Sequence, residues 1–280
     1  MFADLHLHTR FSDGTFSPEE LAAAAKKSGL SAIALTDHDT MEGCASTALA
    51  CAERSIQFLP GCELTAEHEG HELHVLGYGL DETHAGLAHA MGGFQQARQD
   101  RIREIVSRLQ AAGVSIQEEA VFRLANCNSP GRPHVGRALV EAGVCKSMDE
   151  AFDRFLKKSK PGWVPKFRMS AQEVIQLIHL AGGAAVLAHP ALYRLDSALP
   201  ALVQAGLDGL ECLHTKHSAG AVEHYTGLAL EHGLLITGGS DCHGFTKGSP
   251  IIGRIQLPWE RYGLVVARVQ ERRQAVFRAV

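Results

Sequence analysis

The chain has 280 residues, of which 45% are hydrophobic, and a formal net charge of −4 at pH 7. This length fits one large α/β domain with or without an insertion, and this charge gives no general attraction to nucleic acid or acidic membranes. Because no run of 18 apolar residues, no secretory-type leader and no CxxC pair among seven cysteines is found, we expect a soluble, cytoplasmic protein with reduced thiols and no membrane partner.

The first 80 residues are expected to alternate between strands and helices. Residues 2–8 (FADLHLH) are typical of a strand. Ser17, Pro18 and Glu20 then form the sequence signature of a capped helix start, and Gly29 marks its end. The pattern continues with a strand at 31–39, a helix at 42–55 and strands at 56–65 and 71–80.

The pattern then changes to helices alone, before the alternation resumes. Between about residues 81 and 165, apolar residues recur every three or four positions, which predicts a helical insertion. The expected helices in it are 86–113, 116–125, 132–143 and 148–158. After it we expect helices at 170–182, 199–206 and 219–233, and strands at 184–190, 207–214 and 234–243. Seven strands alternating with helices favour a parallel (β/α) barrel that is somewhat irregular.

Ionisable residues gather where the predicted strands end, which is where parallel α/β folds carry out their chemistry. Residues two apart on a strand face the same side, so His6 and His8 project together, as do Asp241 and His243. Glu63, on a neighbouring strand, has two oxygens that can bridge two ions. Mixed histidine and carboxylate ligands without cysteine suit Zn²⁺, Mn²⁺ or Fe²⁺. The sequence therefore predicts a metal site.

Several further polar residues are interpreted as background. Cys242 should face away from its two neighbours and pack in the core. His214 is the least certain of the background histidines, because it ends a strand. Nine histidines are expected to be solvated or hydrogen-bonded at the surface: His68, His71, His84, His89, His179, His214, His217, His224 and His232.

Seven motifs in order, from residue 4 to 244, resemble the PHP (polymerase and histidinol phosphatase) family of metal-dependent phosphoesterases. They are DLHLHTRFSDG, LTDHDT, PGCELT, HVLGY, GRPHVGRAL, LAHP and GSDCHG. The resemblance implies a distorted seven-stranded (β/α) barrel of the PHP type with an inserted helical subdomain. It also implies two or three divalent ions, with Mn²⁺ favoured over Zn²⁺ and Fe²⁺.

The resemblance also implies a role for each matching residue. His6, His8, Glu63 and Asp241 would hold one metal, and Glu63 would bridge to a second. His74 and His134 would complete the second site. Asp13, His38 and His243 would hold the third metal. His189 of the LAHP motif would contact the substrate or transfer a proton. The ions would activate a water that attacks phosphorus and would neutralise charge on the phosphoryl oxygens.

His134 lies in the insertion, so the insertion must fold back over the metals. We therefore expect a barrel domain formed by residues 1–80 and 166–280, and a helical lid formed by residues 81–165 that selects the substrate. The lid and its exit carry basic residues suited to gripping a second phosphate. Arg98 and Arg101 are three residues apart on a predicted helix and therefore share one face. The expected substrate contacts are Arg98, Arg101, Arg132, Lys160 and Arg168. The basic run at 154–168 could equally be a solvated loop.

A helical insertion followed by LAHP looks like the nucleotide-directed branch of the family. The resemblance then implies a phosphatase that removes the 3′-phosphate of 3′,5′-nucleoside bisphosphates and leaves the 5′-monophosphate. An exoribonuclease acting 5′ to 3′ on short RNA is an alternative, although aromatics are only 6% of the chain and duplex nucleic acid is not expected. Histidinol phosphate, a cationic substrate, fits a basic lid poorly. The residue patterns also leave open a non-catalytic PHP module and an amidohydrolase that acts on C–N bonds.

Overall fold

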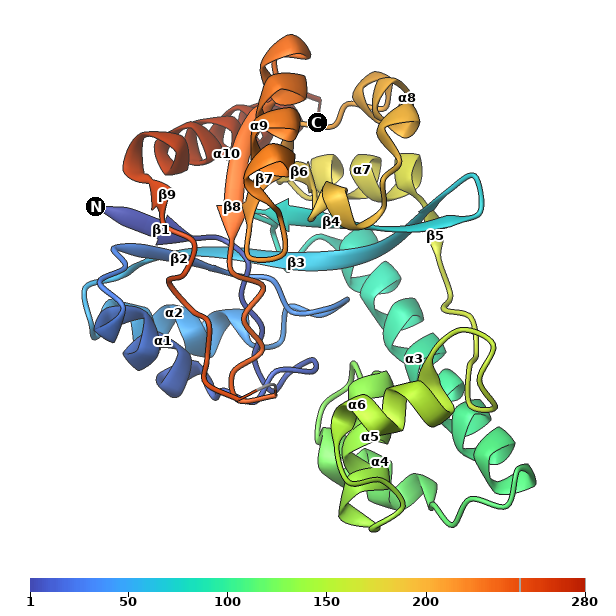
Figure 1. Ribbon diagram of the computed structural model, residues 1–280. Helices are drawn as coiled ribbons and strands as arrows, with labels where there is room; N and C mark the ends of the chain where they lie inside the picture. Colours follow the sequence, from blue (N-terminus) through green and yellow to red (C-terminus); the bar gives the residue numbers. More distant parts are fainter. Residues whose placement is uncertain (247, 280) are drawn as a thin grey trace.

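The computed structural model describes residues 1–246 and 248–279, and one large sheet organises them (Figure 1). Within this part of the chain the sheet has nine strands, in the order β8-β7-β6-β4-β3-β2-β1-β9, with β5 paired to β3. The strands are β1 (Phe2–Asp4), β2 (Ala32–Leu35), β3 (Gln57–His68), β4 (His71–Tyr78), β5 (Met169–Ser170), β6 (Ala184–Leu187), β7 (Gly209–His214), β8 (Leu235–Gly239) and β9 (Leu257–Pro258).

The sheet curls into a nearly closed barrel, as expected. Beyond β1 and β8 the two chain segments meet through the Leu5 N–H donating to Gly238 O (3.1 Å) and the His8 N–H donating to Cys242 O (3.0 Å). Gly239 permits this approach, because a Cβ atom there would lie 2.2 Å from the Cβ of His6. The closure brings the two metal-site motifs from opposite ends of the sequence side by side.

Two details of the sheet differ from the expectation of seven parallel strands. β4 runs antiparallel to both β3 and β6, because β3 and β4 form a hairpin and no helix connects them. β5 and β9 are two-residue strands that lack a recognisable hydrophobic pattern, which accounts for the larger number of strands. The remaining strand pairs along the barrel path, apart from β1 with β9, are parallel.

Helices pack on both faces of the sheet. The Ser17 capping box is confirmed: its side chain accepts from the Glu20 N–H, and the Glu20 side chain accepts from the Ser17 N–H. Tyr262, Val265 and Val269 of the last helix pack on one face of the sheet. No described helix is long and apolar enough to cross a membrane. The barrel helices are α1 (Pro18–Lys27), α2 (Cys44–Ala52), α7 (Ala171–Leu180), α8 (Leu199–Gln204), α9 (Ala219–Glu231) and α10 (Trp259–Ala279).

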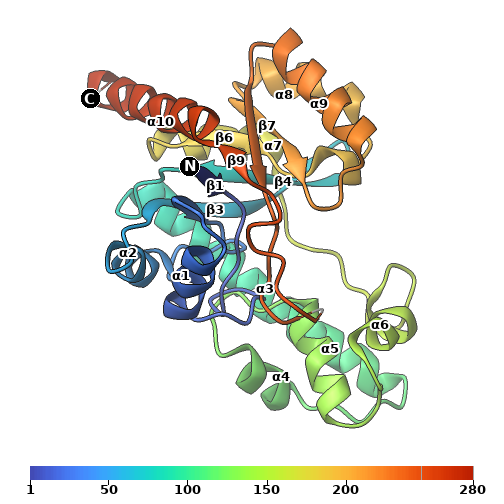
Figure 2. The same cartoon turned by 60° about the vertical axis from the view of Figure 1, so that its left-hand side comes forward.

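A run of helices projects from one side of the barrel (Figures 1 and 2). It has its own hydrophobic cluster, which includes Ile105, Leu109, Val121, Val135 and Leu139. The last predicted helix, 148–158, is shorter than expected and ends in a π-helical turn at Phe152–Leu156. The helices are α3 (Ala85–Ala111), α4 (Glu118–Ala125), α5 (Arg132–Glu141) and α6 (Met148–Ala151).

The insertion is joined to the loops that carry the predicted metal ligands. Ser129 Oγ donates to His38 O (2.5 Å), and Arg137 Nη2 donates to Asp13 O (2.7 Å). A buried ion pair adds to these contacts, with Arg98 Nη2 of α3 lying 2.6 Å from Asp39 Oδ2 after β2. These bonds hold the start of α5 against the end of the barrel where β1 and β2 stop.

Candidate metal centre

Eight of the nine predicted metal ligands converge on one point at the carboxyl ends of the strands. They come from the segments after β1, β2 and β8 and from the inward faces of β3 and β4. Several of these side chains are completely buried, although all are polar. We call this set the histidine–carboxylate cluster; it comprises His6, His8, Asp13, His38, Glu63, His74, Asp241 and His243.

Glu63 lies at the middle of the cluster. Its Oε2 atom is 3.2 Å from His6 Nε2, 3.3 Å from His8 Nε2 and 3.0 Å from His38 Nδ1. The second oxygen, Oε1, is 2.7 Å from His74 Nδ1. Burial disfavours its negative charge, yet the facing histidines hold the pKa of Glu63 well below its usual range. The two oxygens thus face different groups of ligands, as a bridging carboxylate requires.

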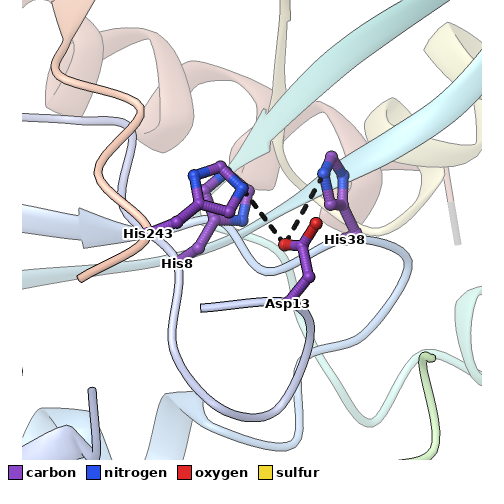
Figure 3. A group of neighbouring side chains, drawn as sticks. All are labelled: His8, Asp13, His38 and His243. Carbon is purple, nitrogen blue, oxygen red and sulfur yellow. Dashed lines mark ion pairs between the residues drawn. The ribbon is translucent and has the colours of Figure 1, made fainter. Parts of the chain in front are cut away.

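Figure 3 shows the neighbouring group formed by His8, Asp13, His38 and His243. Asp13 Oδ1 is 3.1 Å from His243 Nε2 and 4.0 Å from His38 Nε2. The rings of His8 and His243 stack with their centroids 4.1 Å apart. Because one atom from each of these four side chains lies within 4.8 Å of the others, the group has the dimensions of a metal site.

The cluster fits divalent cations on its own chemistry. Buried ligand atoms that include His6 Nε2, His8 Nε2, Asp13 Oδ1 and Glu63 Oε2 have no hydrogen-bond partner among the described residues, which is costly unless an ion satisfies them. Burial disfavours protonation of His8, but Asp241 and Glu63 raise its pKa to about 10. The carboxylates of the cluster therefore favour a positive charge beside them, and bound metal ions would supply that charge.

The backbone is strained at Asp241 of the cluster and at His189, which contacts the cluster. Asp241 has φ of 56° and His189 has φ of 31°, values that residues other than glycine rarely adopt. The Asp241 N–H donates to His6 O (2.9 Å), and the His189 N–H donates to Glu211 Oε2 (2.8 Å). The surrounding structure thus holds both residues in conformations that aim their side chains at the cluster.

Glu211 and His214 belong to this centre, and sequence reasoning missed both. Glu211 Oε1 is 2.9 Å from His6 Nδ1, a contact that turns the second ring nitrogen of His6 toward the cluster. His214 was expected at the surface, but it is only 2% exposed and its Nε2 is 3.5 Å from Asp241 Oδ2. The available signal was a glutamate and a histidine within the otherwise apolar strand GLECLH.

The remaining two predicted residues of the centre occupy different places. His189 Nε2 is 3.0 Å from Glu63 Oε1, so this residue lies inside the centre. His134 is buried, and its Nδ1 accepts from the Gly131 N–H (3.0 Å). Burial lowers the pKa of His134 to about 4. Among the described residues, His134 is outside the groups of ligand atoms that lie within 4.8 Å of one another.

The predicted substrate contacts are mostly engaged within the protein. Arg98 pairs with Asp39, and Arg168 Nη1 is 3.3 Å from Glu67 Oε2, so both arginines neutralise nearby carboxylates. Lys160 is exposed, without an ion pair to any residue the structure describes. These positions show that a shared helix face or a basic run does not by itself place a side chain at the metal centre.

Arg101 and Arg132 differ from Arg98 and Arg168 because they donate to backbone carbonyls and, within the described part of the chain, pair with no carboxylate. Arg101 Nε donates to Val164 O (2.9 Å), and Arg132 Nη1 donates to Leu156 O (3.2 Å). Burial, together with the charges of Arg132 and Arg98, lowers the pKa of Arg101 to about 9.

Lys166 contacts the cluster and lines a small cavity together with Arg98 and Arg101. Its Nζ atom is 3.2 Å from His74 Nε2 and 2.8 Å from Glu72 Oε1. Burial and the charge of Arg98 lower the pKa of Lys166, while Glu72 opposes this shift. A basic group is therefore held directly beside one of the predicted metal ligands.

A family comparison identifies this centre. The family model for the PHP domain matches residues 4–226. The chain belongs to the PHP family. It is therefore a metal-dependent phosphoesterase, a hydrolase of the phosphatase type, and divalent metal ions are its cofactors. The nearly closed barrel and the cluster at its strand ends agree with this assignment.

Three similar proteins extend the comparison. This PHP chain is 33% identical over 261 residues to a 3′,5′-nucleoside bisphosphate phosphatase from Chromobacterium violaceum, covering 90% of this chain and 91% of the relative. It is 33% identical over 247 residues to the 5′-3′ exoribonuclease Rnm of Salmonella typhimurium, covering 86% and 84%. A crystal structure of a Bifidobacterium adolescentis protein, assigned as a metal-dependent phosphoesterase, matches with a TM-score of 0.89 at 32% identity, covering 95% and 96%.

Proposed function

We propose that this protein hydrolyses the 3′-phosphate of 3′,5′-nucleoside bisphosphates to give the 5′-monophosphate and inorganic phosphate. The observations that carry the proposal are a cluster with the dimensions of metal sites and two arginines of the insertion, Arg101 and Arg132, that pair with no carboxylate among the described residues. A substrate with two phosphates satisfies both features, because one phosphate meets the metals and the second meets the arginines. The similarity to a bisphosphate phosphatase supports the same substrate class.

The nine family ligands would hold two or three ions in this mechanism. Mn²⁺ is the proposed metal, and Zn²⁺ or Fe²⁺ would fit the same donors. When bound, the ions supply activation of the attacking water and stabilisation of charge on the phosphoryl oxygens. The proposed ligands are His6, His8, Asp13, His38, Glu63, His74, His134, Asp241 and His243.

His189 is the proposed proton-transfer residue. Its Nε2 is fixed 3.0 Å from Glu63 Oε1, and its Nδ1 is buried without a partner among the described residues. An imidazole held in this way can keep one proton at a defined nitrogen. We propose that the doubly protonated ring keeps the proton that faces Glu63, delivers the proton on Nδ1 to the departing 3′ oxygen of the nucleotide, and is left as neutral imidazole.

The retained 5′-phosphate is assigned to the lid side of the centre. Arg101 and Arg132 have N–H donors beyond those used on the two carbonyls, and a guanidinium matches the geometry of a phosphate. Burial makes such contacts stronger than they would be at the surface. Arg98 and Arg168 are proposed to support this pocket through their ion pairs, and Lys160 to attract the nucleotide from its outer edge.

The proposal predicts a clear substrate preference. Manganese-loaded protein should release phosphate from 3′,5′-adenosine bisphosphate with a kcat/KM about 10- to 100-fold above that for 3′-AMP, because charge-assisted hydrogen bonds to the second phosphate contribute about 1.5–3 kcal/mol. Arg132→Ala should abolish this preference. Arg123→Ala is the matched control, since Arg123 is an exposed arginine of the same insertion that pairs with Glu141.

The assay is phosphate release from 3′,5′-adenosine bisphosphate, 3′-AMP, 5′-AMP, histidinol phosphate and a short 5′-phosphorylated RNA. Equal kcat/KM for all monoesters would contradict selection by the lid. Activity on histidinol phosphate above that on the bisphosphate would contradict the assignment of the arginines. If no phosphate is released although the metal is bound, the phosphatase mechanism is wrong for this chain.

Exoribonuclease activity on short RNA is the second candidate function. It is favoured by the similarity to an Rnm exoribonuclease and by two exposed aromatic rings on segments that also carry residues of the centre. Phe167, next to Lys166, is 54% exposed, and Phe245, two residues after His243, is 64% exposed. Such rings can stack on unpaired bases. Faster turnover of the RNA than of the bisphosphate in the same assay would favour this function.

A further inference from the structure

Lys216 contacts the centre through Asp241, whereas Lys166 contacts it through His74. Starting at Lys166, these contacts run through His74, Glu63 and His8 to Asp241. At that end, Lys216 Nζ lies 2.8 Å from Asp241 Oδ2. The two lysines therefore stand at opposite ends of the contact chain.

The two oxygens of Asp241 have different surroundings. Oδ1 faces the cluster, 3.3 Å from His8 Nε2 and 3.7 Å from His6 Nε2. Oδ2 faces Lys216 and His214. The Lys216 ammonium group is therefore in direct contact with a residue that would hold the metal ions.

The loop that carries Lys216 is anchored on both sides. Thr215 Oγ1 donates to Ser240 O (3.0 Å), and the Lys216 N–H donates to His214 Nδ1 (3.2 Å). His217 Nδ1 lies 2.9 Å from Cys212 O. These contacts tie the loop to the ends of β7 and β8, so the lysine emerges at a fixed point next to the cluster.

The fold makes little use of this lysine. Its side chain is 51% exposed, and Asp241 is its ion-pair partner among the described residues. A half-exposed pair of this kind contributes little to the free energy of unfolding. An ammonium group has three N–H donors, of which one is directed at Asp241 Oδ2, so two remain for a ligand.

We infer that Lys216 is a further catalytic residue, which donates hydrogen bonds to the phosphoryl group that is cleaved. Its positive charge stabilises the negative charge that develops on the phosphoryl oxygens during transfer. The contact with Asp241 keeps the ammonium group in position before the substrate arrives. The inference rests on the proposed phosphatase function, but it holds for any phosphate monoester and does not depend on the second phosphate.

The test compares Lys216→Met and Lys216→Arg with the unchanged protein and with Lys26→Met, which alters an exposed lysine on α1. Titration calorimetry measures the affinity of the manganese-loaded protein for inorganic phosphate. Metal analysis measures the manganese stoichiometry, and steady-state assays give kcat/KM for 3′-AMP.

Lys216→Met should bind phosphate at least about tenfold more weakly and lower kcat/KM about 100-fold, with unchanged manganese stoichiometry. Lys216→Arg should restore part of both losses, and Lys26→Met should match the unchanged protein.

Three results would overturn the inference. If Lys216→Met binds phosphate as tightly as the unchanged protein, the lysine does not touch the phosphoryl group. If it loses manganese, or if Lys216→Arg gives no recovery in a folded protein, the lysine acts only on Asp241 and the fold around it. Inorganic phosphate is a product of every phosphate monoesterase, so its binding does not depend on the second phosphate. If the unchanged protein shows no preference for the bisphosphate, the proposed substrate is wrong and this inference still stands.

Discussion

Glu63→Ala is expected to lower kcat/KM at least about 10³-fold and to remove at least one equivalent of bound manganese. Glu63 is buried at the middle of the cluster, and its two oxygens face two different groups of histidines. Removing it takes a negative charge away from both groups at once, whereas removal of a peripheral ligand affects only one. Metal analysis after gel filtration of the manganese-loaded protein measures the loss of manganese, and phosphate-release kinetics measure the loss of activity.

Glu63→Gln separates charge from shape in this experiment, because it keeps the volume and loses the negative charge. We expect it to behave nearly as Glu63→Ala does, since the histidines need the charge. Glu53→Gln is the matched control, because Glu53 is an exposed glutamate whose ion-pair partner is Arg54. Full manganese stoichiometry in Glu63→Ala would contradict a bridging role.

Asp208→Asn is expected to lower the free energy of unfolding by about 3–5 kcal/mol at pH 7. Asp208 is completely buried, and its Oδ1 is 2.8 Å from Arg268 Nη1 and 2.7 Å from Arg272 Nη2 of α10. Its Oδ2 is 2.9 Å from His179 Nε2 and accepts from the Ala185 N–H (2.9 Å). An amide cannot accept bonds at both positions, so donors are left unsatisfied and α10 loses its attachment to the barrel. Urea denaturation measures the loss.

The effect should depend on pH in a defined direction. Burial opposes the charge of Asp208, but His179, Arg272 and Arg268 hold its pKa well below the usual range. Its contribution to stability is therefore complete above the unfolded-state pKa of about 3.9 and is lost as the pH falls toward the lower folded-state pKa. The difference between Asp208→Asn and the unchanged protein should shrink below about pH 4.

Asp208 precedes β7, at the end of the strand away from the cluster, so folded Asp208→Asn should keep its activity. Asp153→Asn, in an exposed pair with Lys157, is the matched control and should change stability by less than about 1 kcal/mol. If Asp208→Asn also lowers the free energy of unfolding by less than about 1 kcal/mol, the contacts of Asp208 do not attach α10 to the barrel as argued.

Local patterns allowed several features to be predicted from the sequence. The Ser17 capping box depends on four consecutive residues, and the pairing of His6 with His8 depends on the two-residue repeat of a strand. The antiparallel direction of β4 was not predicted, although Glu69 and Gly70, the two residues between β3 and β4, could have indicated a hairpin turn. Glu69 and Gly70 both have positive φ, as in a two-residue hairpin turn, and this turn reverses the chain between β3 and β4.

Features that depend on distant residues could not be predicted in this way. Arg98 shares a helix face with Arg101, as expected, but Asp39, 59 positions earlier in the chain, takes up its charge. Glu211 meets His6 across 205 positions, because the barrel closes and brings β7 near β1. A helical or strand repeat indicates which side chains share a face, and only the closed sheet determines what that face meets.

The most direct test of the central claim is to identify the products formed from 3′,5′-adenosine bisphosphate by phosphorus NMR, with manganese-loaded protein. We predict inorganic phosphate and 5′-AMP, because the cluster cleaves the 3′-phosphate while Arg101 and Arg132 retain the 5′-phosphate. Formation of 3′-AMP and inorganic phosphate would mean that the two phosphates bind the opposite way round, and would contradict the proposed function.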